Sequence, residues 1–432
     1  MLSLCALAMS AALLAGCGGA GDGQSDSGDQ QLVRVPQDSP TIAGAVDRVA
    51  PGGLILVSPG AYREQVNVST ENVTLRGTDR NTVVIDGEGV RPYGVVAAAD
   101  GVRIENLTTT RATLYGVLVT SSMDGDEPLA QGSGGYETID PDQFPPLQRF
   151  SISHVTATNN GLYGIYAFNS QHGVIADSFA SGSADSGIYV GQCRSCDIVV
   201  TGNVAARNAV GFENANASDS VTITGNRFSD NRVGMTLTSD YQEAFTPQRA
   251  NAVFGNVIAD NHEKRSPRHA EGAFGIGIGI AGGRENVIAA NRIAGNPLAG
   301  VLFTNAEDLP AIDNVLRGNL LGDNGVAVAN VSADRAAASG NCVTGDATEL
   351  PRGFAAACEA DAQPAATSQS LPGVNEPEGL SFLHVPLPND LPSLPVDDTI
   401  PDLLPGTVTH PDPAKAKVPA ADLLAAWLTT RA

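Results

Sequence analysis

Aromatic residues are scarce in this sequence, because Phe, Trp and Tyr together make up only 5% of it. A helical core filled with large side chains is therefore disfavoured. Glycine is plentiful, with 48 residues, while charged residues account for only 17%. This composition is typical of many short strands joined by tight turns.

Basic residues are also few, with 25 Lys and Arg against 47 Asp and Glu, which gives a formal net charge of −22. Such a charge disfavours nucleic acid and anionic membrane surfaces as partners. It also disfavours polyanionic substrates, unless a divalent cation or a local basic patch intervenes. We therefore expect no nucleic-acid partner, and the sequence gives no sign of an oligomer, so we expect a monomer.

Long apolar runs are absent outside the N-terminus, and no other stretch could span a bilayer. Residues 2–15 are apolar and small, and Leu14 to Cys17 resembles the lipobox of bacterial lipoproteins. The resemblance implies that residues 1–17 are a signal peptide and that the exported protein is anchored to a membrane only through lipid on Cys17. Two points stand against it: a chance Cys could end such a run, and no Lys or Arg precedes it. Residues 18–31 are expected to be a flexible tether.

Cysteine is sparse as well, and beyond Cys17 the exported chain has Cys193, Cys196, Cys342 and Cys358. Export to an oxidising compartment favours disulfides. Pairing of sequence neighbours, Cys193 with Cys196 and Cys342 with Cys358, is the simplest of three connectivities. The first pair could instead be a redox or metal motif, but no second Cys pair follows at zinc-finger spacing. We therefore favour structural disulfides.

A repeat of about 23 residues runs through the middle of the chain. Ile198 to Asn214 and Val221 to Leu237 superimpose, and each has two short apolar-alternating runs, an Asn, another Asn five residues later, and a Gly opening the next run. Asn at the first position, or a substitute, recurs at Asn106, His154, Asp177, Asn203, Asn226, Asn256, Asn291, Asn319 and Asn341. Stacked Asn side chains at one corner of successive coils can hydrogen-bond along a solenoid. The pattern predicts an all-β fold, a right-handed parallel β-helix over residues 32–360.

The N-terminal block adds a helix and a characteristic turn. Residues 41–49 have helical periodicity, with Asp38 or Ser39 available as the N-cap. The run from Leu54 to Val66 then reads as strand, tight turn and strand. This block resembles the opening of parallel β-helix proteins of the pectin-esterase and NosD-like type, in the pectate-lyase-like superfamily. The resemblance implies a short helix that caps the open end of the coil, which would otherwise expose its core and unpaired edge.

The catalytic motifs of those families are missing. The sequence has no Gly-x-x-Asp-Phe-x-Phe-Gly run of pectin esterases and no paired Asp-Asp with Gly-His-Gly of polygalacturonases. Asp140-Pro141-Asp142 lacks the His of the epimerase Asp-Pro-His motif. NosD-like proteins are associated with copper-site maturation, but only Met123 and Met235 remain after the signal peptide, which argues against a Met-rich copper surface.

Three insertions and a tail depart from the repeat. Residues 122–147 and 239–249 follow equivalent strands and should project from the same side, whereas residues 262–272 leave from the neighbouring corner. Residues 361–432 form a Pro-rich tail that cannot sustain a helix or a central strand. The tail is either a wall-spanning linker or an arm packed along the cylinder, and its Leu residues favour partial packing. Residues 420–429 are expected to form a short amphipathic helix that docks as a tail or binds a partner.

Candidate ligand contacts follow from one outward-facing position of the repeat, which holds Tyr166, Tyr189, Glu213 and Thr236 in consecutive coils. Two Tyr rings beside a carboxylate could form a platform for sugar rings. The alternative is an aromatic ladder that only stabilises strand pairing. The neighbouring residues expected to join the platform are Gln192, Arg207 and Asn214.

Ionisable side chains gather in two further places. The loop from His262 to Glu271 could hold an anionic group, supply a general base or bind a metal, or be only a solvated charged loop. Its candidate residues are His262, Lys264, Arg265, Arg268 and His269. Insertion carboxylates at Asp124, Asp126, Glu127, Asp240 and Glu243 could bind Ca²⁺ or act as an acid–base pair, although acidic loops are ordinary in so acidic a chain. No cofactor is required by the sequence, and Ca²⁺ is the candidate.

These observations predict an exported, lipid-anchored β-helix protein that binds polysaccharide, with Glu213 and His262 or His269 as the pair for cleavage, as a lyase or a hydrolase. A surface or accessory protein that binds another protein with its solenoid face, or a NosD-like accessory of a metal pathway, remains the alternative.

Overall fold

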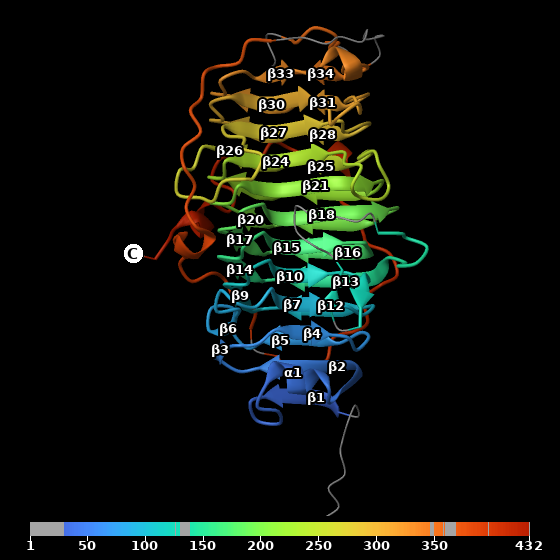
Figure 1. The fold of residues 1–432 in the computed structure, drawn as a ribbon, viewed down its shortest axis with the longest axis vertical. Coiled ribbons are helices and arrows are strands. Elements are labelled where there is room, and N and C mark those ends of the chain that lie inside the picture. Colours follow the sequence, from blue (N-terminus) through green and yellow to red (C-terminus); the bar gives the residue numbers. More distant parts are fainter. Residues whose placement is uncertain are drawn as a thin grey trace, which may run out of the picture.

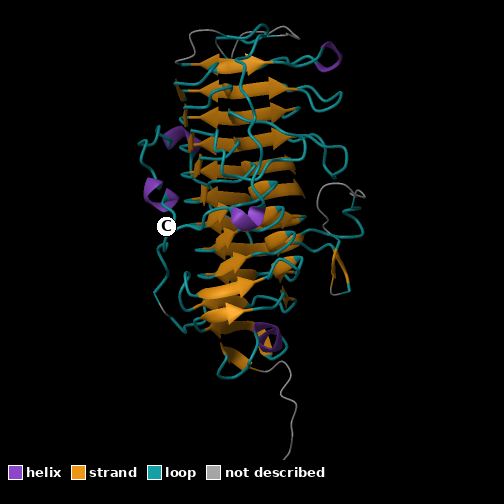
Figure 2. Cartoon of the chain, turned by 60° about the vertical axis from the view of Figure 1, so that its left-hand side comes forward, coloured by secondary structure: helices purple, strands orange, loops and turns teal. Residues whose placement is uncertain are grey.

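The computed structural model is a cylinder built from three long parallel sheets (Figures 1 and 2). It describes residues 30–125, 127–129, 139–345, 350–356, 358, 369–395 and 397–431. Successive strands visit the first, second and third sheet in turn, and every pairing between neighbouring coils within these sheets is parallel. The fold is the right-handed parallel β-helix that the repeat predicts.

The strands of the three sheets are as follows. The first sheet contains β1 (Gln30–Val35), β2 (Val49–Val57), β5 (Thr74–Gly77), β8 (Val102–Glu105), β13 (Leu147–Ser153), β16 (Ser170–Ala176), β19 (Ile198–Thr201), β22 (Val221–Thr224), β25 (Ala252–Phe254), β28 (Val287–Ala289), β31 (Val315–Arg317) and β34 (Cys342–Thr344). The second contains β3 (Gly60–Tyr62), β6 (Val83–Asp86), β9 (Thr108–Thr110), β14 (Thr156–Thr158), β17 (Phe179–Ser181), β20 (Val204–Ala205), β23 (Arg227–Ser229), β26 (Val257–Ala259), β29 (Arg292–Ala294) and β32 (Leu320–Gly322). The third contains β4 (Val66–Val68), β7 (Tyr93–Ala97), β10 (Tyr115–Val119), β15 (Tyr163–Phe168), β18 (Ser186–Arg194), β21 (Val210–Ser218), β24 (Val233–Thr238), β27 (Ile276–Ala281), β30 (Ala299–Thr304) and β33 (Val328–Asn330). A separate antiparallel hairpin pairs β11 (Met123–Asp124) with β12 (Glu127–Pro128).

The interior of the cylinder is filled by apolar side chains stacked in register. Ile175, Val200 and Ile223 occupy equivalent positions in three successive coils of the first sheet, and all three are fully buried. Small and β-branched residues suit these short strands, because each strand contributes few side chains to a narrow core. The scarcity of aromatic residues is therefore a property of the cylinder itself.

Buried Asn ladders run along the corners between the sheets. The Nδ2 group of Asn203 donates to Oδ1 of Asn226, Asn226 donates in the same way to Asn256, and Asn256 to Asn291. A second ladder five residues later joins Asn208, Asn231, Asn261, Asn296 and Asn324. Asn341, predicted at the first corner, instead accepts from Asn314 in a third ladder that begins before β28. The sequence repeat did not predict this third ladder, because loops of variable length come before its Asn positions.

The N-terminal helix α1 (Ile42–Val46) is shorter than predicted and has a different N-cap. Thr41 caps it, since its Oγ1 accepts the Gly44 N–H at 3.1 Å. The Glu64 carboxylate accepts the N–H groups of Ile42 and Ala43 at 3.0 and 2.9 Å. A carboxylate is favourable at a helix N-terminus, where backbone N–H groups have no intrahelical partner. Glu64 of the turn after β3 therefore binds the first coil to the helix that packs on it.

The C-terminal tail packs along the outside of the cylinder as an arm over many coils (Figure 1). Arg232, fully buried, donates to the carbonyl groups of Pro377 and Glu378. Nearer the N-terminus, fully buried Arg80 donates to Pro392 O, and Arg34 pairs with Asp398. Buried guanidinium groups are costly unless they are hydrogen-bonded, so the backbone carbonyls of the arm satisfy them.

The part of the arm around Val408 and His410 is held by a small polar cluster. Asp197 accepts from His172 and His410, each at 2.7 Å, and from the Val408 N–H at 2.8 Å. The two histidine contacts and the backbone contact lower the pKa of Asp197, although burial opposes this. The cluster joins the outer face of β16 and the turn before β19 to the arm.

The end of the arm is not the amphipathic helix expected over residues 420–429. Residues 421–424 form turns, and a 3₁₀ helix, η4 (Ala425–Leu428), follows Leu424, whose backbone is left-handed (φ 55°). The apolar side chains of this segment are nevertheless packed, because Leu424, Trp427 and Leu428 contact Phe179 and Val204. The apolar spacing thus identified the buried face but not the type of helix. Over a single turn, the same spacing of apolar residues fits an α-helix and a 3₁₀ helix. The other 3₁₀ turns are η1 (Asp334–Ala336), η2 (Phe382–His384) and η3 (Pro413–Lys415).

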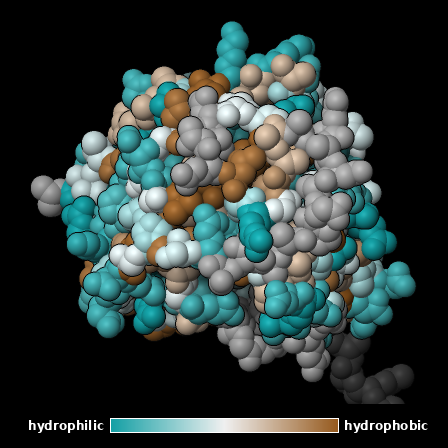
Figure 3. All heavy atoms as spheres, turned by 90° about the horizontal axis from the view of Figure 1, so that it is seen from above, coloured by the Kyte–Doolittle hydropathy of each residue, from teal (hydrophilic) through white to brown (hydrophobic). Residues whose placement is uncertain are grey.

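The two ends of the chain differ in how they close the cylinder. Figure 3 looks down on the C-terminal end, where apolar atoms gather in the middle and hydrophilic side chains surround them. Phe354 packs against Phe303 there, with ring centroids 4.7 Å apart, and the Cys342–Cys358 disulfide fixes the same segment. Within the part of the chain that the structure describes, no helix is long and apolar enough to cross a membrane.

Candidate active-site cleft

A cleft of about 840 Å³ opens on the outer face of the third sheet, around β18 and β21. Its walls come from the loop between β24 and β25, the loop between β26 and β27 and the segment after β30. The residues that carry its chemistry are Asp185, Tyr189, Glu213, Asp240, Tyr241, Glu243, His269, Glu271 and Glu307. A cleft whose floor is a rigid sheet and whose walls are loops is a common setting for ligand sites.

Asp185, Glu213 and His269 form the centre of this cleft. Ser186 Oγ donates to Glu213 Oε2 at 2.6 Å, and His269 Nε2 lies 3.5 Å from Asp185 Oδ1. Burial, together with the nearby charge of Asp185, raises the pKa of Glu213 to about 8. Burial opposes the charged imidazole, but the hydrogen bond to Asp185 and the charges of Asp185 and Glu213 raise the pKa of His269 to about 9. At neutral pH the cleft therefore holds a protonated Glu213 beside a His269–Asp185 ion pair.

Glu243 is a second carboxyl group with perturbed protonation. It is only 5% exposed, its Oε1 accepts the Tyr189 hydroxyl proton, and its Oε2 is buried without a hydrogen-bond partner among the described residues. Burial raises the pKa of Glu243 well above its ordinary value. Two carboxyl groups with strongly raised pKa values in one cleft are unusual for structural positions and are the pattern expected of functional ones.

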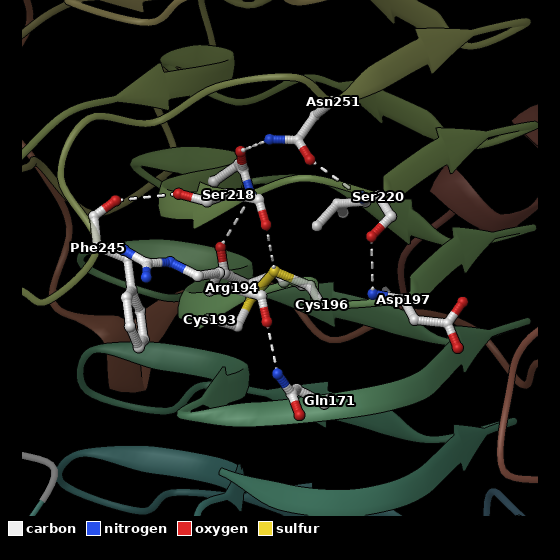
Figure 4. The surroundings of a disulfide bond; sticks show 12 residues. Gln171, Cys193, Arg194, Cys196, Asp197, Ser218, Ser220, Phe245 and Asn251 are labelled. Carbon is white, nitrogen blue, oxygen red and sulfur yellow. Dashed lines mark hydrogen bonds between the residues drawn. A yellow bond between two sulfur atoms is a disulfide. The ribbon is translucent and has the colours of Figure 1, made fainter. Parts of the chain in front are cut away.

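The loop that carries Asp240 and Glu243 is braced by the C-terminal end of β18 and the turn after it (Figure 4). Gln192 Oε1 accepts the Ala244 N–H at 3.1 Å, and the Arg194 guanidinium lies over the Phe245 ring, 4.9 Å from its centroid. The Cys193–Cys196 disulfide closes this turn, as predicted, and Gln171 donates to the Arg194 carbonyl. The disulfide therefore has a structural role beside the cleft.

The predicted sugar platform is not exposed. The register is as expected, with Tyr166, Tyr189, Glu213 and Thr236 paired in order, but Tyr166 and Tyr189 are 0% and 1% exposed. Tyr166 stacks on Tyr163 at 4.4 Å, and the row of rings is overlaid by side chains that include Met123 and Ile139. The sequence did not show that the insertions fold back over this face.

Three neighbours expected to join the platform have other roles. Gln192 braces the loop described above, and Asn214 points into the interior, where its Oδ1 accepts from Gln248 and Asn251. Arg207 lies in the turn between β20 and β21 and donates to Leu428 O of the arm. Side chains alternate between the two faces of a strand, so Glu213 outside requires Asn214 inside.

The ionisable loop is divided between two places. His269 reaches the cleft, and Arg268 pairs with Glu376 of the arm at 2.9 Å. His262, Lys264 and Arg265 line a separate hollow with Asp230 and Asp260. Of the two histidines proposed for acid–base chemistry, the structure thus places His269 beside Glu213, and His262 elsewhere.

The acidic insertions do not form one cluster either. Asp240 and Glu243 line the cleft, whereas Asp124 and Glu127 belong to the β11–β12 hairpin and are not among its lining residues. Asp126 lies outside the described residues, as does Cys17. No group of three or more His, Cys, Asp or Glu that could hold a metal ion occurs in the described ranges.

Sequence reasoning missed Asp185 and Glu307, and it named Glu271 only as the end of the ionisable loop. Asp185 had a usable signal, because it comes directly before a third-sheet strand, one coil from Glu213, and such a position turns outward at the same corner. Glu307 had none, since it lies in a loop of irregular length.

Comparison with protein families finds one match. The model of the family described as periplasmic copper-binding protein (NosD) matches residues 54–273, which is half of the chain. No curated protein matches the sequence significantly. The periplasmic description and the two disulfides fit an extracytoplasmic protein.

Comparison with solved structures finds proteins of the same fold. The A-module of a mannuronan C-5 epimerase from Azotobacter vinelandii is similar over 70% of this chain and 80% of that module, with a TM-score of 0.52 and 16% identity. A second epimerase A-module of that organism covers 74% and 86%, with a TM-score of 0.49 and 16% identity. A pectate lyase covers 73% and 76%, with a TM-score of 0.40 and 15% identity. At these identities the likeness shows the β-helix fold and nothing finer.

Copper, named in the family description, can be tested against the donors present. Copper sites favour Cys, Met and His ligands. Cys193, Cys196, Cys342 and Cys358 are all in disulfides, and Met235 is buried in the core. Together with the lack of a metal-ligand cluster in the described ranges, this means that those residues do not fit a copper site.

Proposed function

The chain belongs to the NosD family, and from that premise we propose that it is an extracytoplasmic protein that binds a polysaccharide in the cleft and cleaves it. The observation that supports this most directly is the protonated Glu213 beside Asp185 at the floor of an 840 Å³ cleft. A carboxyl group that keeps its proton at neutral pH is what a glycosidic leaving oxygen requires. Lipid attachment at Cys17 is part of the same proposal and would hold the enzyme at a membrane surface.

In this mechanism Glu213 donates its proton to the glycosidic oxygen as the bond to the anomeric carbon breaks. A water molecule adds to that carbon and gives its proton to the Glu213 carboxylate left by the first step, which restores the starting state. Asp185 interacts directly with Glu213 and is too close to it to act on a water across the sugar ring, so its charge keeps Glu213 protonated while His269 holds Asp185 in place. Glu213 is thus the catalytic residue, and Asp185 and His269 are positioning residues.

The test is release of new reducing ends by the full exported chain on a panel of neutral, amino-bearing and acidic polysaccharides, with Ca²⁺ and with EDTA. Glu213→Gln should lower the rate by at least about 100-fold, because general acid catalysis contributes that much. Glu71→Gln, an exposed change near the N-terminal end, should leave the rate unchanged. Lack of product from any polysaccharide would exclude cleavage, and binding without product would leave a binding protein.

A protein-binding accessory role is the second candidate. It is supported by the arm, whose exposed Leu387, Ile400 and Leu403 are 43%, 37% and 62% accessible. Capture of an envelope protein that depends on these three side chains, by a chain that binds no glycan, would favour it.

A further inference from the structure

The proposed cleft has a strong bias in charge. Carboxyl groups line it from six residues: Asp185, Glu213, Asp240, Glu243, Glu271 and Glu307. Among its described lining residues the cationic side chain is His269, which Asp185 already pairs. No Lys or Arg is present in that lining. A polyuronate such as the mannuronan named for the similar epimerase would be repelled here, since like charges in a partly desolvated cleft cost several kcal/mol.

A second feature of the cleft is a buried carboxyl oxygen of Glu243. Glu243 Oε2 has no hydrogen-bond partner among the described residues, although Glu243 is 5% exposed and lines the cleft. A buried polar atom without a partner destabilises the folded chain, and a ligand that bonds it relieves this. A ligand that supplies a charged N–H donor would satisfy this atom and would also favour ionisation of Glu243.

The rim of the cleft is suited to a sugar rather than to a bare ion. Tyr241, 48% exposed, lines the cleft, and its hydroxyl donates to Asp308 at 2.7 Å. Pyranose faces stack on aromatic rings. The absence of a metal-ligand cluster in the described ranges points the same way.

We infer that the ligand of the cleft is a glycan with free amino groups, a polymer of amino sugars whose ammonium groups meet the Glu243, Glu271 and Glu307 carboxyl groups. This inference rests on the proposed function and specifies its substrate class. It also restricts the chemistry to hydrolysis, because β-elimination of the kind that lyases perform needs a uronic acid next to the cleaved bond. Binding of an ammonium group at Glu243 releases protons, since it stabilises the ionised carboxylate, while Glu213 keeps the proton that the reaction uses.

The experiment is titration calorimetry of the full exported chain, in its Glu213→Gln form to prevent cleavage, with three hexasaccharides: glucosamine, N-acetylglucosamine and galacturonic acid. The glucosamine hexamer should bind at least about 10-fold more tightly than the acetylated one, and the difference should shrink in about 0.5 M salt. Galacturonate should not bind. Repeating the titration at pH 7 in two buffers of different ionisation enthalpy should reveal proton release with the glucosamine hexamer alone.

Matched charge changes locate the effect. Glu271→Gln and Glu307→Gln alter exposed residues of the cleft and should each weaken glucosamine binding by about 3- to 10-fold, with little effect on the acetylated hexamer. Glu71→Gln removes the same charge away from the cleft and should change neither affinity. Equal changes in all three variants would mean that the net charge of the protein, not the cleft, attracts the ligand.

The outcomes separate this inference from the proposed function. Tighter binding of the acetylated or the acidic hexamer would overturn the amino-sugar inference and leave polysaccharide binding intact. Lack of binding by all three hexamers would overturn both. Polylysine that competes as well as the glucosamine hexamer would show that the cleft recognises positive charge of any polymer, and the glycan class would be wrong.

Discussion

The corner ladders and the cleft both bury polar side chains, but they treat them in opposite ways. In the ladder, Asn226 donates to Val200 O at 2.8 Å and to Asn256 at 3.0 Å, and its own oxygen accepts the Asn203 N–H at 3.0 Å. In the cleft, Glu213 and Glu243 keep protons that they would lose in water, and one oxygen of Glu243 has no partner among the described residues. The ladder satisfies each polar group within the chain, whereas the cleft leaves groups that a ligand can satisfy.

This difference shows which buried polar groups stabilise the fold and which destabilise it. A satisfied buried hydrogen bond contributes about 1 kcal/mol, while a buried carboxyl group without full compensation costs more than that. Sites of this second kind persist only where the surrounding scaffold can tolerate them, and the stacked coils on either side supply that scaffold. The contrast can be tested by breaking each region separately.

The largest effect on stability should come from Asn226→Ala. It removes three donated hydrogen bonds and two accepted ones and leaves buried groups of two neighbouring coils without partners, so the free energy of unfolding should fall by about 3 kcal/mol or more. Denaturant unfolding followed by circular dichroism measures this. Asn389→Ala, which removes one exposed contact to Thr429, should cost well under 1 kcal/mol. Similar losses in both variants would show that the ladder adds nothing specific.

An intermediate effect should appear in the pH dependence of stability. The pKa of Glu213 is raised from 4.5 to about 8 and that of His269 from 6.5 to about 9, so the folded state binds more protons than the unfolded state between these values. The contribution of Glu213 and His269 to the free energy of unfolding should therefore be greatest below pH 4.5 and should fall as the pH rises toward 9. One such proton gives a slope of at most about 1.4 kcal/mol per pH unit.

Glu213→Gln tests that slope directly. The variant removes one titrating group, so melting temperatures measured from pH 5 to 8 should vary less than those of the original chain, while the two proteins should be about equally stable at pH 5. A variant that follows the original chain at every pH would mean that Glu213 is not the group that takes up the extra proton.

The smallest effect should come from His410→Ala in the arm. It removes one hydrogen bond to Asp197, at 2.7 Å, and one to Thr222, at 2.8 Å, both partly exposed, so about 1 kcal/mol of stability should be lost. The change should appear as faster proteolysis within residues 397–420, with cleft binding unaltered. Loss of glycan binding in this variant would show that the arm and the cleft are coupled.

The sequence predicted the cylinder well because its information is periodic. Asn203 and Asn226 lie 23 residues apart and meet in space, so the repeat states the contact directly. The cleft is assembled from residues with no such relation: Asp185 and His269 are 84 residues apart, and a loop of irregular path brings them together. The same limit explains the platform error, since Tyr166 faces outward as its position requires and is nevertheless buried by an insertion.

The arm has a consequence for how the molecule unfolds. In a plain solenoid each coil contacts only its neighbours, so the ends can fray one coil at a time. Here one segment of chain bonds to Arg34 in the first strand, to Arg80 and Arg232 further along, and to Arg292 near the far end, through Pro419 O. A coil cannot open at either end without breaking a contact that also involves the arm. The cylinder should therefore resist stepwise fraying and unfold as a longer cooperative unit than its repeats alone would allow.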